Sequence, residues 1–125
     1  MDSFFESGIR VFPMVGGDLR FHPGDPGVLT RFMELGQRLA RLQPEGDAAA
    51  TQWQQADANC RELLNWVFPG NDFKLLLGEV NVLSVCPDGK TVLEKFLEAV
   101  AQILREGMRA FAQQLAQVHL QAEAQ

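Results

Sequence analysis

Residues 91–120 read TVLEKFLEAVAQILREGMRAFAQQLAQVHL, and this stretch decides the fold. Apolar side chains recur in it mostly at steps of three and four residues, the period of a helix with one apolar side. They are Leu93, Phe96, Leu97, Val100, Ile103, Leu104, Met108, Phe111, Leu115 and Val118. Thr91 and Glu94 have the spacing of a capping box, which places the start of the helix. The sequence therefore predicts a helix over residues 91–120, with residues 121–125 as a frayed tail.

The predicted helix is long for a chain of 125 residues. At about 1.5 Å per residue it spans roughly 45 Å, whereas a compact chain of this size has a diameter of roughly 36 Å. Fraying of the last turns is the alternative to a projecting helix, but it does not explain why Phe111, Leu115 and Val118 keep the apolar phase. We expect the surplus apolar surface to bind a partner.

The composition of the chain limits the classes of protein to which it can belong. With 46% hydrophobic and 22% charged residues, residues 1–125 are expected to form a single folded domain. The net charge is −5, and the 11 basic residues are scattered, which argues against nucleic-acid binding. The sequence has neither a signal-peptide pattern nor a membrane span, so we expect a cytoplasmic protein. Cys60 and Cys86 lack metal or redox spacing and are interpreted as reduced, small apolar residues.

The amino-terminal part predicts a β-hairpin over residues 9–22. Gly16, Gly17 and Asp18 form its turn, because glycine supplies the backbone conformations that tight hairpins need. Pro13 makes the first strand an edge strand or a bulged one. An isolated hairpin is marginally stable, so this one should pack on helices or on the strands of another subunit.

Three further helices are predicted between the hairpin and the last helix. Asp25 and Pro26 begin the first, residues 25–42, as cap and first helical residue. Its inner face is predicted to hold Leu29, Phe32, Met33, Gly36, Leu39 and Ala40. Asp47 is expected to cap a helix over residues 47–68, and a short one follows over residues 71–78, closed by Gly78. The fold class is mainly α: a small bundle of three to four helices with a short N-terminal β-hairpin and a long C-terminal helix.

The candidate motifs for catalysis are weak. Residues 84–91, SVCPDGKT, resemble a phosphate-binding loop but carry Ser84 where the first glycine should be, and predict a turn followed by a helix cap. His22 and His119 have no partners at metal-ligand spacing, and Asp57, Glu94 and Glu98, like the other helix carboxylates, are expected on solvated helix faces. We therefore expect a protein that is not an enzyme and that uses neither cofactor nor metal.

The partner-binding residues are predicted from exposed apolar character. Methionine and large apolar side chains on a helix suit a groove that accepts several sequences. Trp66 falls slightly off the inner line of its helix, whereas a tryptophan on that line is more often core. The predicted partner-binding residues are Met33, Trp66, Met108, Phe111, Leu115 and Val118.

The order of elements resembles a known family. A hairpin over residues 11–21 and a Phe- and Leu-rich helix lead to LLNWVFPG at residues 63–70 and NDFKLLLG at residues 71–78. LEKFLEA at residues 93–99 then opens the last helix. This pattern resembles the small tail assembly chaperones of long-tailed, siphovirus-type bacteriophages and prophages, over roughly residues 11–105.

The resemblance implies a non-catalytic chaperone in the host cytoplasm, absent from the mature virion. Such a protein coats the tape-measure protein, keeps its long apolar helix soluble and hands it to the tail tube protein. The alternative is a helical homo-oligomer, structural or regulatory, whose C-terminal helix pairs with its own copy. A self-associating protein has a fixed stoichiometry when purified alone, whereas a client-binding one tightens only when the partner is added.

Overall fold

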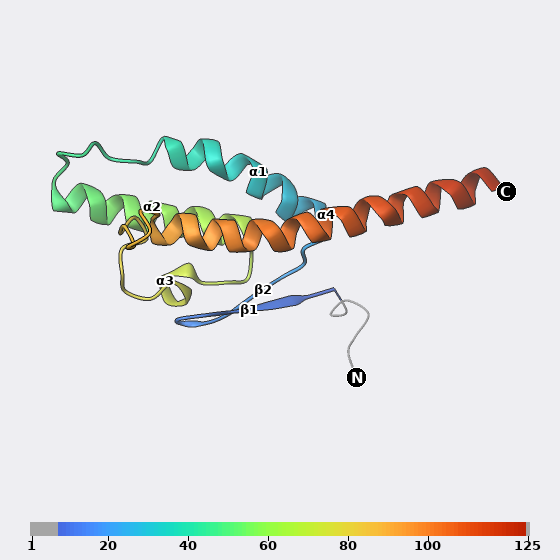
Figure 1. Cartoon of the computed structure of the whole chain (residues 1–125), viewed down its shortest axis with the longest axis horizontal. Helices are drawn as coiled ribbons and strands as arrows, with labels where there is room; N and C mark the ends of the chain where they lie inside the picture. The colour runs from blue at the N-terminus through green and yellow to red at the C-terminus, as the bar shows by residue number, and fades with distance from the viewer. Residues whose placement is uncertain (1–7, 125) are drawn as a thin grey trace.

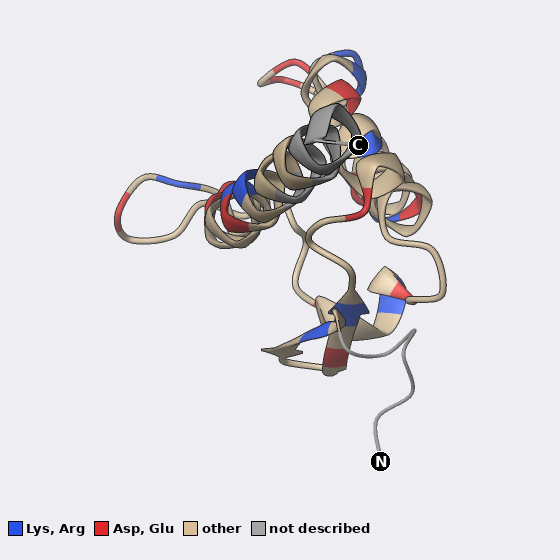
Figure 2. Ribbon diagram, turned by 90° about the vertical axis from the view of Figure 1, so that its right-hand side faces the viewer, with Lys and Arg blue, Asp and Glu red and all other residues tan. Residues whose placement is uncertain are grey.

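The computed structural model describes residues 8–124, except for the side chains of residues 111, 114, 115 and 118–124. Its elements are β1 (Arg10–Met14), β2 (Gly17–Phe21), α1 (Pro26–Ala40), α2 (Ala50–Val67), α3 (Phe73–Leu76) and α4 (Val92–Ala124). Figure 1 shows α1, α2 and α4 lying lengthwise side by side, with the hairpin and α3 below them. Viewed from the end, the three long helices again lie on one side and the hairpin on the other (Figure 2). The predicted fold class is confirmed: the chain is mainly helical, with a hairpin at its start and a long helix at its end.

The hairpin turns one residue earlier than predicted. Met14 pairs with Gly17, so the two-residue loop is Val15 and Gly16, and Gly17 already belongs to β2. A Cβ at Gly16 would overlap the carbonyl oxygen of Leu75, because the loop lies directly against α3. The Gly16 N–H donates to the carbonyl oxygen of Leu76 over 3.1 Å, which fixes this contact. The glycine is therefore required by close packing.

The outer edge of β2 is covered by a side chain. Asn71 accepts a hydrogen bond from the backbone N–H of Arg20 at 3.0 Å and donates one to the Arg20 carbonyl oxygen at 2.9 Å. Its amide thereby pairs with β2 as a neighbouring strand would. The hairpin is thus held by its own chain, as expected if it packs against the helical part.

Helix α1 begins as predicted, but its buried face is different. The Asp25 side chain accepts from the Gly27 N–H at 2.8 Å, and Pro26 is the first helical residue. The helix ends at Ala40, two residues before the predicted end. Its fully buried residues are Val28, Leu29 and Leu35, whereas Met33, Gly36 and Ala40 of the predicted inner face are exposed. Phe32 and Leu39 are half-buried against the core.

Helix α2 begins three residues later than predicted, at Ala50. The prediction that Asp47 caps it was wrong. Ala49 occupies the cap position, and its backbone N–H donates to the side-chain oxygen Oε1 of Gln52 at 2.8 Å. The side chain of Gln52 therefore does what the predicted cap would have done, from inside the helix.

An ion pair on α2 holds the loop that follows α3. Arg61 is 5% exposed; its Nε lies 3.0 Å from Oδ2 of Asp57. Its two terminal nitrogens donate to the carbonyl oxygens of Phe73, Lys74 and Val80. The expectation that Asp57 is solvated was wrong, because its carboxylate also accepts from the Val82 N–H at 2.8 Å.

The remaining elements close the core. Asp72 caps α3, which covers only residues 73–76 of the predicted 71–78, and Gly78 with φ +72° ends that turn. The apolar residues after it form a loop in which Val82 is fully buried. Five phenylalanines from the hairpin, the end of α2, α3 and α4 pack together between the two layers. Three of their ring contacts are edge-on, and the contact between Phe68 and Phe73 is tilted: the five are Phe12, Phe21, Phe68, Phe73 and Phe96.

Helix α4 is 33 residues long, about 50 Å. The Thr91 hydroxyl accepts from the Glu94 N–H at 3.0 Å, as the capping-box spacing predicts. The helix continues to Ala124, past the predicted end at residue 120, so residues 121–124 are helical rather than a frayed tail. Figure 1 shows its carboxyl-terminal half extending beyond the other elements.

Candidate functional site

The apolar stripe of α4 divides into two parts at Gly107. Before it, Leu93, Phe96, Val100 and Leu104 are at most 7% exposed and belong to the core. Leu97 and Ile103 pack beside them, half-buried. This first part of the stripe is covered by the chain itself and serves folding.

Gly107 is the point where α4 leaves the rest of the protein. It is buried, and a Cβ at this position would overlap the carbonyl group of Pro23. The Pro23 and Gly24 backbone therefore crosses α4 in direct contact with it. We call residues 8–107 the body and residues 108–124 the projecting segment.

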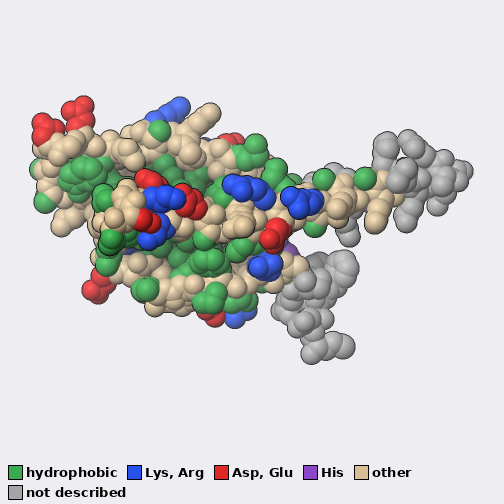
Figure 3. Space-filling view, in the orientation of Figure 1, with side chains coloured by type: hydrophobic (Ala, Val, Ile, Leu, Met, Phe, Trp, Pro, Cys, Tyr) green, Lys and Arg blue, Asp and Glu red, His purple; other side chains and the backbone are tan. Residues whose placement is uncertain are grey.

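In the projecting segment, every side chain that the structure describes is exposed. These residues are Met108, Arg109, Ala110, Ala112, Gln113, Ala116 and Gln117. Met108, one of the predicted partner-binding residues, is 44% exposed. In the space-filling view the coloured atoms of this segment extend away from the body (Figure 3). The side chains of Phe111, Leu115 and Val118 lie outside the described residues, so their assignment still rests on sequence spacing.

The two other predicted partner-binding residues lie on different sides of α1. Met33 is 71% exposed. Trp66 of α2 is half-buried, and the Arg38 guanidinium carbon lies 4.3 Å from the centre of its ring. Met33 and Arg38 are five positions apart on α1, hence about 140° around the helix axis. Met33 and Trp66 therefore do not form one surface along α1.

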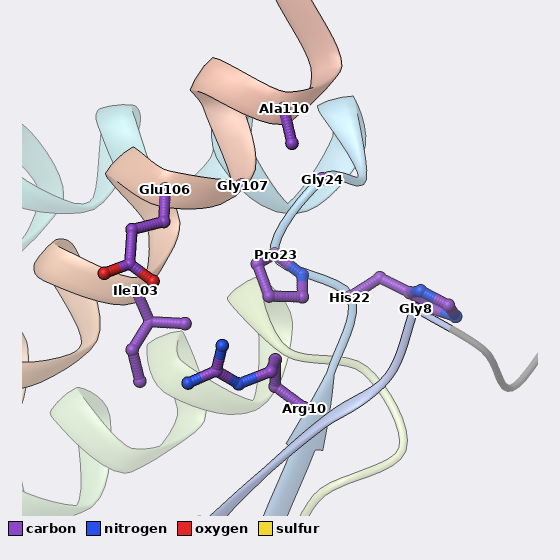
Figure 4. Close-up of a pocket in the computed structure, with 9 residues that line it drawn as sticks. All are labelled: Gly8, Arg10, His22, Pro23, Gly24, Ile103, Glu106, Gly107 and Ala110. Atoms are coloured by element: carbon purple, nitrogen blue, oxygen red, sulfur yellow. The ribbon is translucent and has the colours of Figure 1, made fainter. Parts of the chain in front are cut away.

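A hollow of about 410 Å³ lies where the hairpin meets the exit of α4. Figure 4 shows the charged ends of Arg10, from β1, and Glu106, from α4, turned toward one another, with Ile103 and Pro23 between the two elements. Sequence reasoning missed this hollow, because its residues are far apart in the chain. The signal available was Gly107, a helix-destabilising residue within an apolar stripe.

The segment that resembles a phosphate-binding loop is a turn tied to α4. The Lys90 ammonium lies 2.9 Å from the Glu98 carboxylate, and this hydrogen bond raises the pKa of Lys90. The backbone N–H of Lys90 lowers the pKa of Asp88, and Lys95, 3.2 Å from that carboxylate, lowers it further. Gly89, with φ +85°, makes the turn. The lysine is thus engaged in an ion pair on the helix surface.

Among the described residues, no three His, Cys, Asp or Glu side chains are grouped so that they could hold a metal ion. None of the helices in that part of the chain has the length and apolar character needed to cross a membrane. Comparison with protein-family models, curated proteins and solved structures finds no match to this chain.

Proposed function

We propose that this protein is a non-catalytic tail assembly chaperone of a long-tailed bacteriophage, which binds the tape-measure protein with the projecting segment of α4. The observation that supports the proposal is the division at Gly107: the body covers α4 up to this residue, and the helix continues to Ala124. A helix that projects in this way offers its apolar side to another helix. The tail tube protein is the proposed recipient of the client.

The chemistry of the projecting segment suits a long amphipathic client. Met108 is flexible and exposed, and such side chains adapt to several partner sequences. Affinity would come from buried apolar area, about 25 cal/mol per Å² before ordering costs. A net charge of −5 would keep neighbouring copies on one client apart.

The test is co-expression with the tape-measure protein, followed by measurement of the soluble fraction of that protein. Replacing Phe111 and Leu115 together by serine should abolish solubilisation, and Met108→Ser should weaken it. The matched control replaces Gln113 and Gln117, which have the same spacing on the same helix and are exposed, by serine. The control should solubilise the client as the unaltered protein does.

The same variants must leave the body folded. The described side chains of the projecting segment are exposed, so the free energy of unfolding should change by no more than about 0.5 kcal/mol. If the serine pair unfolds the monomer, the segment folds back onto the body and the proposal fails. If the protein instead forms a fixed oligomer that the serine pair dissociates, self-association is the function of the segment.

A further inference from the structure

A second surface with basic and apolar side chains lies between α1 and α2. It is an open hollow of about 470 Å³ between the end of α1 and the carboxyl-terminal half of α2. We call it the cationic groove and define it by the residues Arg38, Arg41, Leu42, Glu62, Leu63 and Trp66.

The lining residues of the groove are arranged so that a helix could bind between α1 and α2. On α2, Asn59, Leu63 and Trp66 follow one another at steps of four and three and so form one line along that helix. Across from them, Arg41 and Leu42 lie three and four positions after Arg38, at and just past the end of α1. Two such lines on neighbouring antiparallel helices leave a channel in which a third amphipathic helix can lie.

The apolar part of the groove is incompletely covered. Leu42, Leu63 and Trp66 are all half-buried. The guanidinium carbon of Arg38 lies 4.3 Å from the centre of the Trp66 ring, so the guanidinium covers one face of the ring. Its N–H donors lie at the edge of the guanidinium plane and can still form hydrogen bonds. Tryptophan and arginine together at the centre of a patch are the residues that most often dominate a protein interface.

The groove has more basic than acidic residues, whereas the whole protein has more acidic than basic ones. Arg38 and Arg41 outnumber Glu62, whereas the complete chain carries 16 acidic and 11 basic residues. The ion pair of Arg38 with Glu34 is 3.6 Å long and half-exposed, so it holds the guanidinium only weakly. Within the described residues, Arg41 forms no ion pair.

Basic residues at the end of α1 also complement its helix dipole. That explanation accounts for the two arginines but not for a tryptophan and two leucines that are only half-buried beside them.

We propose that the cationic groove binds an acidic amphipathic helix of a partner protein. Its apolar side packs on Leu42, Leu63 and Trp66, and its carboxylates pair with Arg38 and Arg41.

The inference goes beyond the proposed function and is tested separately from it. The probe is a synthetic helix of about five turns, with leucine at steps of three and four and glutamate beside it. Trp53→Phe in the full chain leaves Trp66 as the single tryptophan, so its fluorescence reports binding. Calorimetry gives the dissociation constant independently. We expect binding in the micromolar range, about 1–100 µM.

Variants locate the binding site. Arg41→Gln should weaken binding severalfold, and the pair Arg38→Gln and Arg41→Gln about tenfold or more. Glu62→Gln should strengthen it, because it removes the carboxylate that lines the groove and repels the acidic probe. Arg105→Gln, an exposed arginine on α4 outside the groove, is the matched control and should have no effect.

Several results would overturn the proposal. They are no binding up to about 1 mM probe, equal binding of a probe with lysine in place of glutamate, unchanged affinity of the double arginine variant, and self-association that buries Trp66 in the absence of probe. Binding that survives Phe111→Ser and Leu115→Ser would show that the groove acts independently of the projecting segment. Loss of probe binding in that variant would contradict the proposed location in the groove.

Discussion

Alanine in place of Gly107 tests whether the body holds α4 at the point where the projecting segment begins. A Cβ at this position would overlap the carbonyl carbon and oxygen of Pro23 and would lie 2.6 Å from the Pro23 Cβ. The carbonyl atoms belong to the backbone and cannot rotate away as a flexible side chain would. Either α4 or the segment that carries Pro23 must therefore move.

The expected change in the free energy of unfolding follows from a comparison with Gly36, a second glycine in a helix. A Cβ at Gly36 would meet nothing within 4 Å. Alanine is favoured over glycine inside a helix by about 1 kcal/mol, and both positions gain this amount. Overpacking costs about 1–3 kcal/mol, and contact with backbone atoms places Gly107 near the upper end. We expect Gly36→Ala to stabilise the protein by up to about 1 kcal/mol and Gly107→Ala to destabilise it by about 2 kcal/mol.

Urea unfolding followed by tryptophan fluorescence measures the difference. With a slope of about 2 kcal/mol per M, a gap of about 3 kcal/mol separates the two midpoints by about 1.5 M. If Gly107→Ala raises the midpoint as much as Gly36→Ala does, α4 does not pass against Pro23. The division of the helix into a packed part and a projecting part would then be refuted.

Two further predictions concern α2. Arg61→Met should lower the free energy of unfolding by about 3–5 kcal/mol, because a carboxylate that is only 20% exposed loses its ion pair and three backbone carbonyls lose their donor. Urea unfolding measures this loss, and Arg105→Met, on an exposed face, should change the free energy of unfolding little. Burial raises the pKa of the Cys60 thiol from 9.0 to about 11. Between these values only the unfolded chain has released the proton, so the free energy of unfolding should fall as the pH rises through this range, and Cys60→Ala should remove that part of the decline. A retained slope in Cys60→Ala would assign it to other groups.

The sequence predicted the start of a helix well where the cap residue and the N–H group that it binds are at most three residues apart. Asp25 with Pro26 and Thr91 with Glu94 both begin helices as expected, because each supplies its hydrogen bond within its own turn. The prediction for Asp47 was wrong because Ala49 is the cap residue, and the side chain of Gln52 accepts from its N–H from inside the helix.

Burial was harder to predict because it depends on neighbours far away in the chain. The apolar residues of α1 spread over an arc of about 160°, with Leu35 at one edge and Met33 at the other, and contact with other elements decides that Leu35 is buried and Met33 exposed. Asp57 and Arg61, four positions apart, have the spacing of a surface ion pair. Only the loop after α3, which folds over them, makes the pair part of the interior.

The projecting segment needs no covering surface to be helical, because the body has already nucleated the helix. Formation of the first turn is the unfavourable step, and each residue added to an existing helix propagates it with an equilibrium constant of about 1–1.6. Residues 108–124 contain neither glycine nor proline, and most are alanine, glutamine and leucine, which favour helix. A client would therefore meet a binding surface whose backbone is already ordered. Because that ordering cost is not incurred again on binding, a modest apolar contact can suffice for association.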